Sequence, residues 1–217
     1  MDSSGMFNVH GEPFIDLYKR SLISCAERRR VEAEFSEVCL NFQAECNLQP
    51  VFVKDMAYHA NQFLADEFIC SVTNTFLIRH PKYSIPSLYR MRPDFDESQT
   101  GFEGQYALFN RIIDVTGKPA HVIDAEELKR NPETTISGYF QYIGFTMPKG
   151  VLTWKQGTRN DWAERESWHV DAINSVGFEN KATIDPTEEL PGRVLELIDR
   201  NLPYYEYLKQ FTLTKTG

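Results

Sequence analysis

Two cationic side chains follow short apolar runs of the sequence and suggest a site for an anion. Lys54 ends the run 50–53, and Arg79 ends the run 75–78. Short apolar runs bounded by charged or turn residues are typical of buried strands. Ligands of parallel sheets bind beyond the carboxyl ends of the strands. We therefore expect Lys54 and Arg79 to lie near one crevice.

The guanidinium of Arg79 offers a planar fork for a phosphate or a carboxylate. Ser87 follows eight positions later, about two helical turns onward, and its hydroxyl can turn back toward the same anion. In the alternative interpretation, Arg79 pairs with a buried carboxylate and Ser87 only fills space. The spacing alone leaves both interpretations open.

Three further residues have types suited to acid–base chemistry. His59 follows Lys54 by five positions, and an imidazole suits general-base work near neutral pH. His10 and Glu12 end another short strand and can form an acid–base pair. The alternatives are that His59 is a half-buried helix residue and that Glu12 stabilises the N-terminus of the helix begun by Pro13.

The order of elements indicates an α/β fold. Short apolar strands alternate with amphipathic helices, which predicts a three-layer fold with a parallel sheet flanked by helices. Strands are expected at 7–10, 50–54, 75–79 and 120–124. Helices are expected at 26–46, 57–65, 102–115, 132–143, 191–200 and 204–211.

Length and composition indicate one domain. The 217 residues are 41% hydrophobic and 13% aromatic, which is enough to build a core. We expect a single domain over 1–217, in which the loop-rich, tryptophan-rich and helical part 146–217 closes the site. A net charge of −8 argues against a dedicated nucleic-acid binder.

The cysteines and the apolar runs bear on metal binding, on the cellular compartment and on membrane insertion. Cys25, Cys39, Cys46 and Cys70 show no C-x-x-C spacing and no zinc-like cluster, so we expect no metal. Four reduced thiols in a cytoplasmic protein are expected, with one disulfide in a secreted protein as the alternative. No apolar segment has the length of a membrane span or a signal peptide.

Several segments, in order, resemble the sulfotransferase family of the P-loop nucleotide-binding class. Arg79 and Ser87 keep the spacing of the family's 3′-phosphate-binding segment. The other similar segments are His10 to Phe14, Val53 to Met56, Val122 to Leu128 with Pro132 and Gly144-Phe145, Leu152 to Gly157, Asp161-Trp162 and Trp168-His169. The similarity covers roughly residues 7–210.

The resemblance implies a donor and roles for these residues. The family's donor is 3′-phosphoadenosine 5′-phosphosulfate (PAPS), whose 3′-phosphate Arg79 and Ser87 would bind. By position, Lys54 would contact the bridging oxygen and His59 would serve as base toward an acceptor hydroxyl. Lys155 and Arg159 would belong to a late basic loop that closes over the nucleotide.

The sequence departs from the family at its start. The family's loop of the type Pro-Arg-Ser-Gly-Ser-Thr, which cradles the 5′-phosphosulfate, has no counterpart in residues 1–5. The domain is therefore expected to be N-terminally truncated relative to the family. The explanations are a relative that has abandoned PAPS, a chain that begins inside a longer protein, and a second chain that supplies the missing part.

Three functions follow from these alternatives. The first is a sulfotransferase-like enzyme that acts on a small organic molecule and transfers a sulfuryl group from PAPS to a hydroxyl. The second is a repurposed lyase, cyclase or hydrolase that uses no nucleotide, and the third is a non-catalytic binding module. Because a missing strand exposes a sheet edge, we also expect a homodimer.

Overall fold

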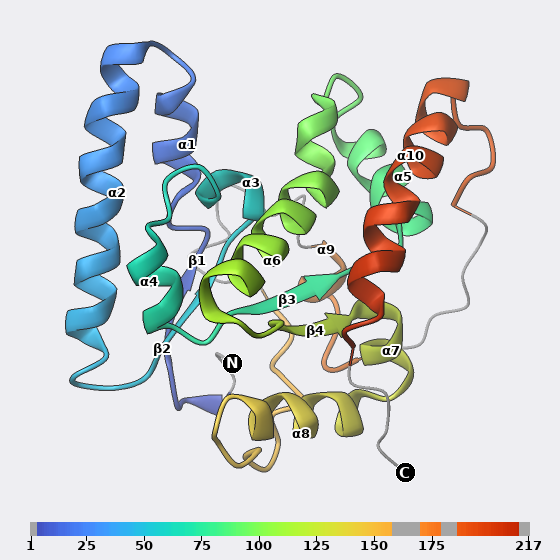
Figure 1. The fold of residues 1–217 in the computed structure, drawn as a ribbon. Coiled ribbons are helices and arrows are strands. Elements are labelled where there is room, and N and C mark those ends of the chain that lie inside the picture. The colour runs from blue at the N-terminus through green and yellow to red at the C-terminus, as the bar shows by residue number, and fades with distance from the viewer. Residues whose placement is uncertain (1–3, 158–169, 179–185, 213–217) are drawn as a thin grey trace.

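The structure, a computed structural model, describes residues 4–157, 170–178 and 186–212 and has an α/β fold with parallel strands (Figure 1). The strands are β1 (Asn8–Gly11), β2 (Val51–Lys54), β3 (Thr75–Ile78) and β4 (His121–Asp124). The helices are α1 (Ile15–Ser21), α2 (Cys25–Glu45), α3 (Ala57–Ala60), α4 (Asp66–Ser71), α5 (Pro81–Met91), η2 (Glu97–Thr100), α6 (Phe102–Thr116), α7 (Ala125–Arg130), α8 (Pro132–Tyr142), α9 (Val170–Ile173) and α10 (Gly192–Lys209). Each predicted strand is present.

The four strands form two separate pairs. β1 pairs with β2 and β3 pairs with β4, both in parallel, so that Gly11 lies opposite Lys54 and Ile78 lies opposite Asp124. The single sheet expected from the sequence is therefore divided in two within the described residues. Each strand has four residues, and no described strand lies between β2 and β3 to join the pairs.

A first core joins α1, α2 and β2. Val31, Phe35 and Phe42 recur at helical spacing along α2 and are all buried. Phe14, just before α1, stacks on Phe35 with ring centroids 4.0 Å apart. Ser24 caps α2 by accepting a hydrogen bond from the Glu27 amide. The helix predicted over 26–46 is thereby confirmed.

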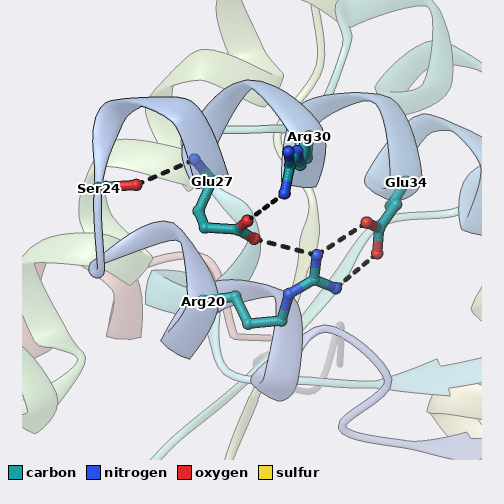
Figure 2. Close-up of polar contacts among 5 residues, drawn as sticks. All are labelled: Arg20, Ser24, Glu27, Arg30 and Glu34. Carbon is teal, nitrogen blue, oxygen red and sulfur yellow. Dashed lines mark hydrogen bonds and ion pairs between the residues drawn. The ribbon is translucent and has the colours of Figure 1, made fainter.

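A polar network clamps the exposed side of α1 to α2 (Figure 2). The guanidinium of Arg20 donates to both carboxylate oxygens of Glu34, at 2.6 and 2.8 Å, and to Glu27 at 3.3 Å. Arg30 also donates to Glu27, at 2.8 Å. The hydrogen bonds from Arg20 lower the pKa of Glu34 below its ordinary value of 4.5.

A second core surrounds β3 and β4. Figure 1 shows α5, α6 and α10 on one side of these strands and α8 on the other. Phe76 and Ile78 of β3 are buried against Phe109 of α6 and Tyr205 and Leu208 of α10. This cluster holds both strands from one side, while Leu77 of β3 is 56% exposed on the other.

Two expected helix boundaries were wrong. α10 is one helix with Pro203 inside it, because Asn201, Tyr205 and Leu208 keep one buried face on both sides of the proline. The helix expected over 57–65 ends at Ala60 and is followed by α4. Local patterning misplaced both boundaries because buried contacts from distant elements decide where these helices end.

We predict that Arg20→Gln lowers the melting temperature near neutral pH and weakens its pH dependence. A carboxylate with a lowered pKa in the folded state stabilises the protein above its unfolded pKa, and that contribution is lost as pH falls through the folded value. Thermal unfolding at about pH 7 and about pH 3.5 measures the effect. Lys19→Gln, which removes an exposed pair 3.7 Å long with Asp16, is the control and should change little. Equal pH profiles for wild type and Arg20→Gln contradict the prediction.

Candidate functional site

A cavity of about 590 Å³ lies between β2 and β3. Residues 52–57 and 74–77 contribute to it as unbroken runs. Successive side chains of a strand point to opposite faces, so a cavity that touches consecutive residues borders the edge of the strand. The cavity is therefore bounded by the unpaired edges of β2 and β3.

Apolar side chains from several elements close the cavity. Gln105 of α6 also lines it and donates to the carbonyl of Leu77 at 3.0 Å, so one strand-edge carbonyl is satisfied from a helix. The apolar lining includes Phe102, Leu108 and Ile112 of α6, Ile136, Tyr139 and Phe140 of α8, and Val151, Trp154 and Phe178 from the later loops. This lining suits the apolar body of a small organic ligand.

The structure brings Lys54 and Arg79 to this cavity. Lys54 ends β2, its side chain is 52% exposed, and its Nζ contacts a carboxylate oxygen of Glu12. Arg79 follows β3, its side chain is 42% exposed, and its Nε lies 3.8 Å from Oε1 of Glu126. Two cations from two different sheets thus border one space.

Ser87 is not among the described residues that line the cavity, whereas Ser84 of the same helix is. The Ser84 hydroxyl lies one turn closer to Arg79 and donates to the carbonyl of His80 at 3.4 Å. The role of Ser87 in anion binding stays a prediction.

His59 lies buried behind the end of β2, with 3% of its side chain exposed. Its Nδ1 is 2.6 Å from Oδ1 of Asp55, and its ring packs against Tyr18 and Tyr58. The second oxygen of Asp55 accepts from the amide of Phe14 at 2.8 Å. Burial also raises the pKa of Tyr58 to about 12. The dyad fixes the imidazole and ties β2 to the start of α1.

His10 and Glu12 do not pair with each other. The Nε2 of His10 is 2.8 Å from Oε2 of Glu45 on α2, and the same oxygen accepts from Asn8 at 2.7 Å. The contact with His10 lowers the pKa of Glu45. Glu12 instead contacts Lys54, and it is not among the described residues that line the cavity.

The later predicted residues divide between described and undescribed parts of the chain. Lys155 is exposed and does not line the cavity, and Arg159, with the segment 158–169, lies outside the described residues. Trp154 lines the cavity, donates from Nε1 to Ser175 at 3.2 Å and meets Phe178 edge to face at 5.2 Å.

Asp124 and Tyr205 support the Arg79 side of the site. The Tyr205 hydroxyl donates to Asp124 at 2.6 Å, and the other Asp124 oxygen caps α7 by accepting from the Glu127 amide at 2.8 Å. Burial, followed by the bond to Asp124, raises the pKa of Tyr205. Glu126 lies in this capped turn and also accepts from the amide of His80 at 3.1 Å. Sequence reasoning missed Glu126, although its place just after a strand was a usable signal.

The described residues include no group of three His, Cys, Asp or Glu side chains placed to hold a metal ion. No helix among them is both long and apolar enough to span a membrane.

The comparison with known protein families identifies the family of this chain. The family described as "Sulfotransferase domain" matches the chain over residues 4–212. The chain belongs to the sulfotransferase domain family. This confirms the resemblance inferred from the ordered segments.

Two curated relatives from Arabidopsis thaliana are similar at low identity. "Branched-chain-amino-acid aminotransferase-like protein 1" is 27% identical over 181 residues, covering 76% of this chain and 32% of that protein. "Branched-chain-amino-acid aminotransferase-like protein 2" is 25% identical over 149 residues, covering 67% and 26%. The chain thus corresponds to about a quarter to a third of their length. No solved structure matches at a comparable level.

We predict that Asp55→Ala destabilises the protein by about 3–5 kcal/mol, because it removes one partner of a buried pair. Urea unfolding measures the loss. Asp16→Ala removes an acid that is 83% exposed and serves as the control. A loss no larger than that of the control contradicts the structural role of Asp55.

Proposed function

We propose that the protein is a sulfotransferase-like enzyme that uses the cavity between β2 and β3 to bind an anionic donor and a small organic acceptor. The observation that carries the proposal is that Lys54 and Arg79 reach one cavity from the ends of two different sheets. Cationic groups fixed where charge develops stabilise a transition state without reorganisation.

The chemistry divides between these residues. PAPS would supply a sulfuryl group on a phosphate leaving group, and an acceptor hydroxyl would attack the sulfur in line as the bridging oxygen departs with its electron pair. Lys54 would neutralise charge on that oxygen, while Arg79 would bind the 3′-phosphate. The role of His59 as base toward the acceptor hydroxyl stays a prediction, because its imidazole is buried and is not among the described residues that line the cavity.

The size and lining of the cavity support a small-molecule substrate. Its volume of about 590 Å³ falls within the usual range for such sites. Aromatic and aliphatic side chains supply most of the lining, and Val151, Trp154 and Phe178 come from the part 146–217. We accordingly propose that one domain forms the site and that its C-terminal part closes it.

The same lining favours a second candidate function. A repurposed lyase, cyclase or hydrolase requires an apolar, aromatic-lined pocket where the donor would otherwise lie, and residues such as Phe76, Phe102 and Phe140 supply one. This candidate needs no nucleotide. Nucleotide binding therefore separates it from the sulfotransferase proposal.

We predict that Lys54→Gln and Arg79→Gln each weaken binding of adenosine 3′,5′-bisphosphate by about tenfold to a hundredfold, the usual range for a lost hydrogen bond to a charged group. Titration calorimetry measures the affinities. Lys118→Gln removes an exposed cation that does not line the cavity and should leave binding unchanged. Absence of wild-type binding at millimolar ligand rules out the nucleotide-dependent function and leaves the repurposed one.

Exposed apolar side chains away from the cavity, such as Leu40 of α2 and Leu48 just after it, tend to recruit further polypeptide. We propose that, in the 217-residue chain alone, a second copy covers this surface and makes a homodimer.

Sedimentation equilibrium of the 217-residue chain tests this assembly. We predict a species of twice the chain mass of 25.1 kDa. Leu48→Lys, which places a charge on an exposed apolar position away from the cavity, should shift it to the monomer. A wild-type monomer at high concentration contradicts the proposal.

A further inference from the structure

Lys54, the cation at the end of β2 that lines the cavity, already has an anionic partner. Glu12 follows β1 directly, and the register that sets Gly11 opposite Lys54 brings Glu12 alongside. The Glu12 amide donates to the Lys54 carbonyl at 2.6 Å, and its carboxylate contacts Nζ of the same lysine. Backbone and side chain of Glu12 therefore both engage one residue.

The backbone of Glu12 adopts a conformation that a residue with a side chain rarely takes. Its φ is +54°, in the left-handed region. Such conformations persist only where the surroundings fix them, and they cluster at functional sites. Here the tight turn aims the carboxylate back at Lys54.

Arg79 also faces an acid, but that acid is held differently. One oxygen of Glu126 lies 3.8 Å from Nε of Arg79, and the other accepts from the amide of His80. The structure shows no hydrogen bond from the terminal guanidinium nitrogens of Arg79 to the described residues. The amide of His80 thus holds Glu126, and the terminal guanidinium nitrogens of Arg79 remain available to a ligand. Glu12, in contrast, already contacts Nζ of Lys54.

The Glu12–Lys54 pair is weak enough to open. The Lys54 side chain is 52% exposed and that of Glu12 is 22% exposed, so solvent screens the attraction. Exposed ion pairs contribute little to stability. A ligand with two or more negative charges interacts with Lys54 more strongly than one carboxylate does, and it also gains the Arg79 fork.

We propose that Glu12 is a resident counter-ion that competes with an anionic ligand of the phosphate class for Lys54 and thereby lowers the affinity of the site for that ligand. This inference rests on the proposed function, in which Lys54 and Arg79 bind the anionic donor. It assigns Glu12 a part in ligand affinity and no part in proton transfer. Binding then exchanges one anionic partner of Lys54 for another.

Titration calorimetry on the 217-residue chain with inorganic pyrophosphate tests the exchange. We expect Glu12→Gln to bind pyrophosphate about fivefold more tightly, the effect of losing one weak competing pair. Glu12→Gln/Lys54→Gln should bind no better than Lys54→Gln alone. Weaker or unchanged binding by Glu12→Gln overturns the inference.

Two further variants separate competition from general effects. Asp16→Asn removes the charge of an exposed acid on α1 and should not tighten binding. Glu12→Asn also removes the charge, and asparagine tolerates the left-handed backbone, so it should reproduce Glu12→Gln with the fold kept. Thermal unfolding of each variant monitors the fold. If Asp16→Asn tightens binding as much as Glu12→Gln does, net charge explains the gain and the inference is overturned.

The outcomes also distinguish this inference from the function on which it rests. Lys54-dependent binding by wild type without tightening by Glu12→Gln keeps the proposed site and overturns the role of Glu12. Undetectable binding by wild type and by Glu12→Gln overturns both. Binding by Glu12→Gln alone, lost again on adding Lys54→Gln, supports the competitor role most strongly.

Discussion

Parallel pairing of the strands is the constraint on which the candidate site depends. Within each pair the backbone ladder fixes which residues stand side by side, Gly11 with Lys54 and Ile78 with Asp124. The two strand ends of each pair therefore lie at the same edge. Because β2 and β3 border one cavity, Lys54 and Arg79 both line it although they come from different sheets.

An aspartate at or just after a strand end supports each half of the site. Asp55, next to the end of β2, binds His59 and the amide of Phe14 before α1. Asp124, which ends β4, caps α7 and accepts from Tyr205 of α10. Carboxylates that accept several hydrogen bonds are expensive to displace, so these two aspartates hold the turns that carry Glu12 and Glu126.

The sequence predicted the strands and helices better than the side-chain contacts between them. The four strands, α2, α6 and α8 followed from apolar runs and helical spacing, since those signals are local. That Lys54 and Arg79 line one cavity was expected from the strand ends that they follow. The pairing of His10 with Glu45 did not, because it joins residues 35 positions apart and depends on how α2 packs.

The other differences between the expected and the observed structure also depend on contacts between residues far apart in the sequence. Division of the sheet reflects which edges are covered, and a strand pattern carries no information about its neighbours. Asp55 and Glu126 were missed as site residues because an acid beside a strand end serves equally as a helix cap, a structural partner or a catalytic group. Family membership, in contrast, could be recognised from the sequence because several similar segments keep their order along the chain.

A crystal structure of the protein with adenosine 3′,5′-bisphosphate tests the central claim most directly. The account predicts that the anionic groups of the ligand lie within hydrogen-bonding distance of both Lys54 Nζ and the Arg79 guanidinium, in the cavity between β2 and β3. A ligand bound elsewhere, or held by only one of these cations, would contradict the shared site.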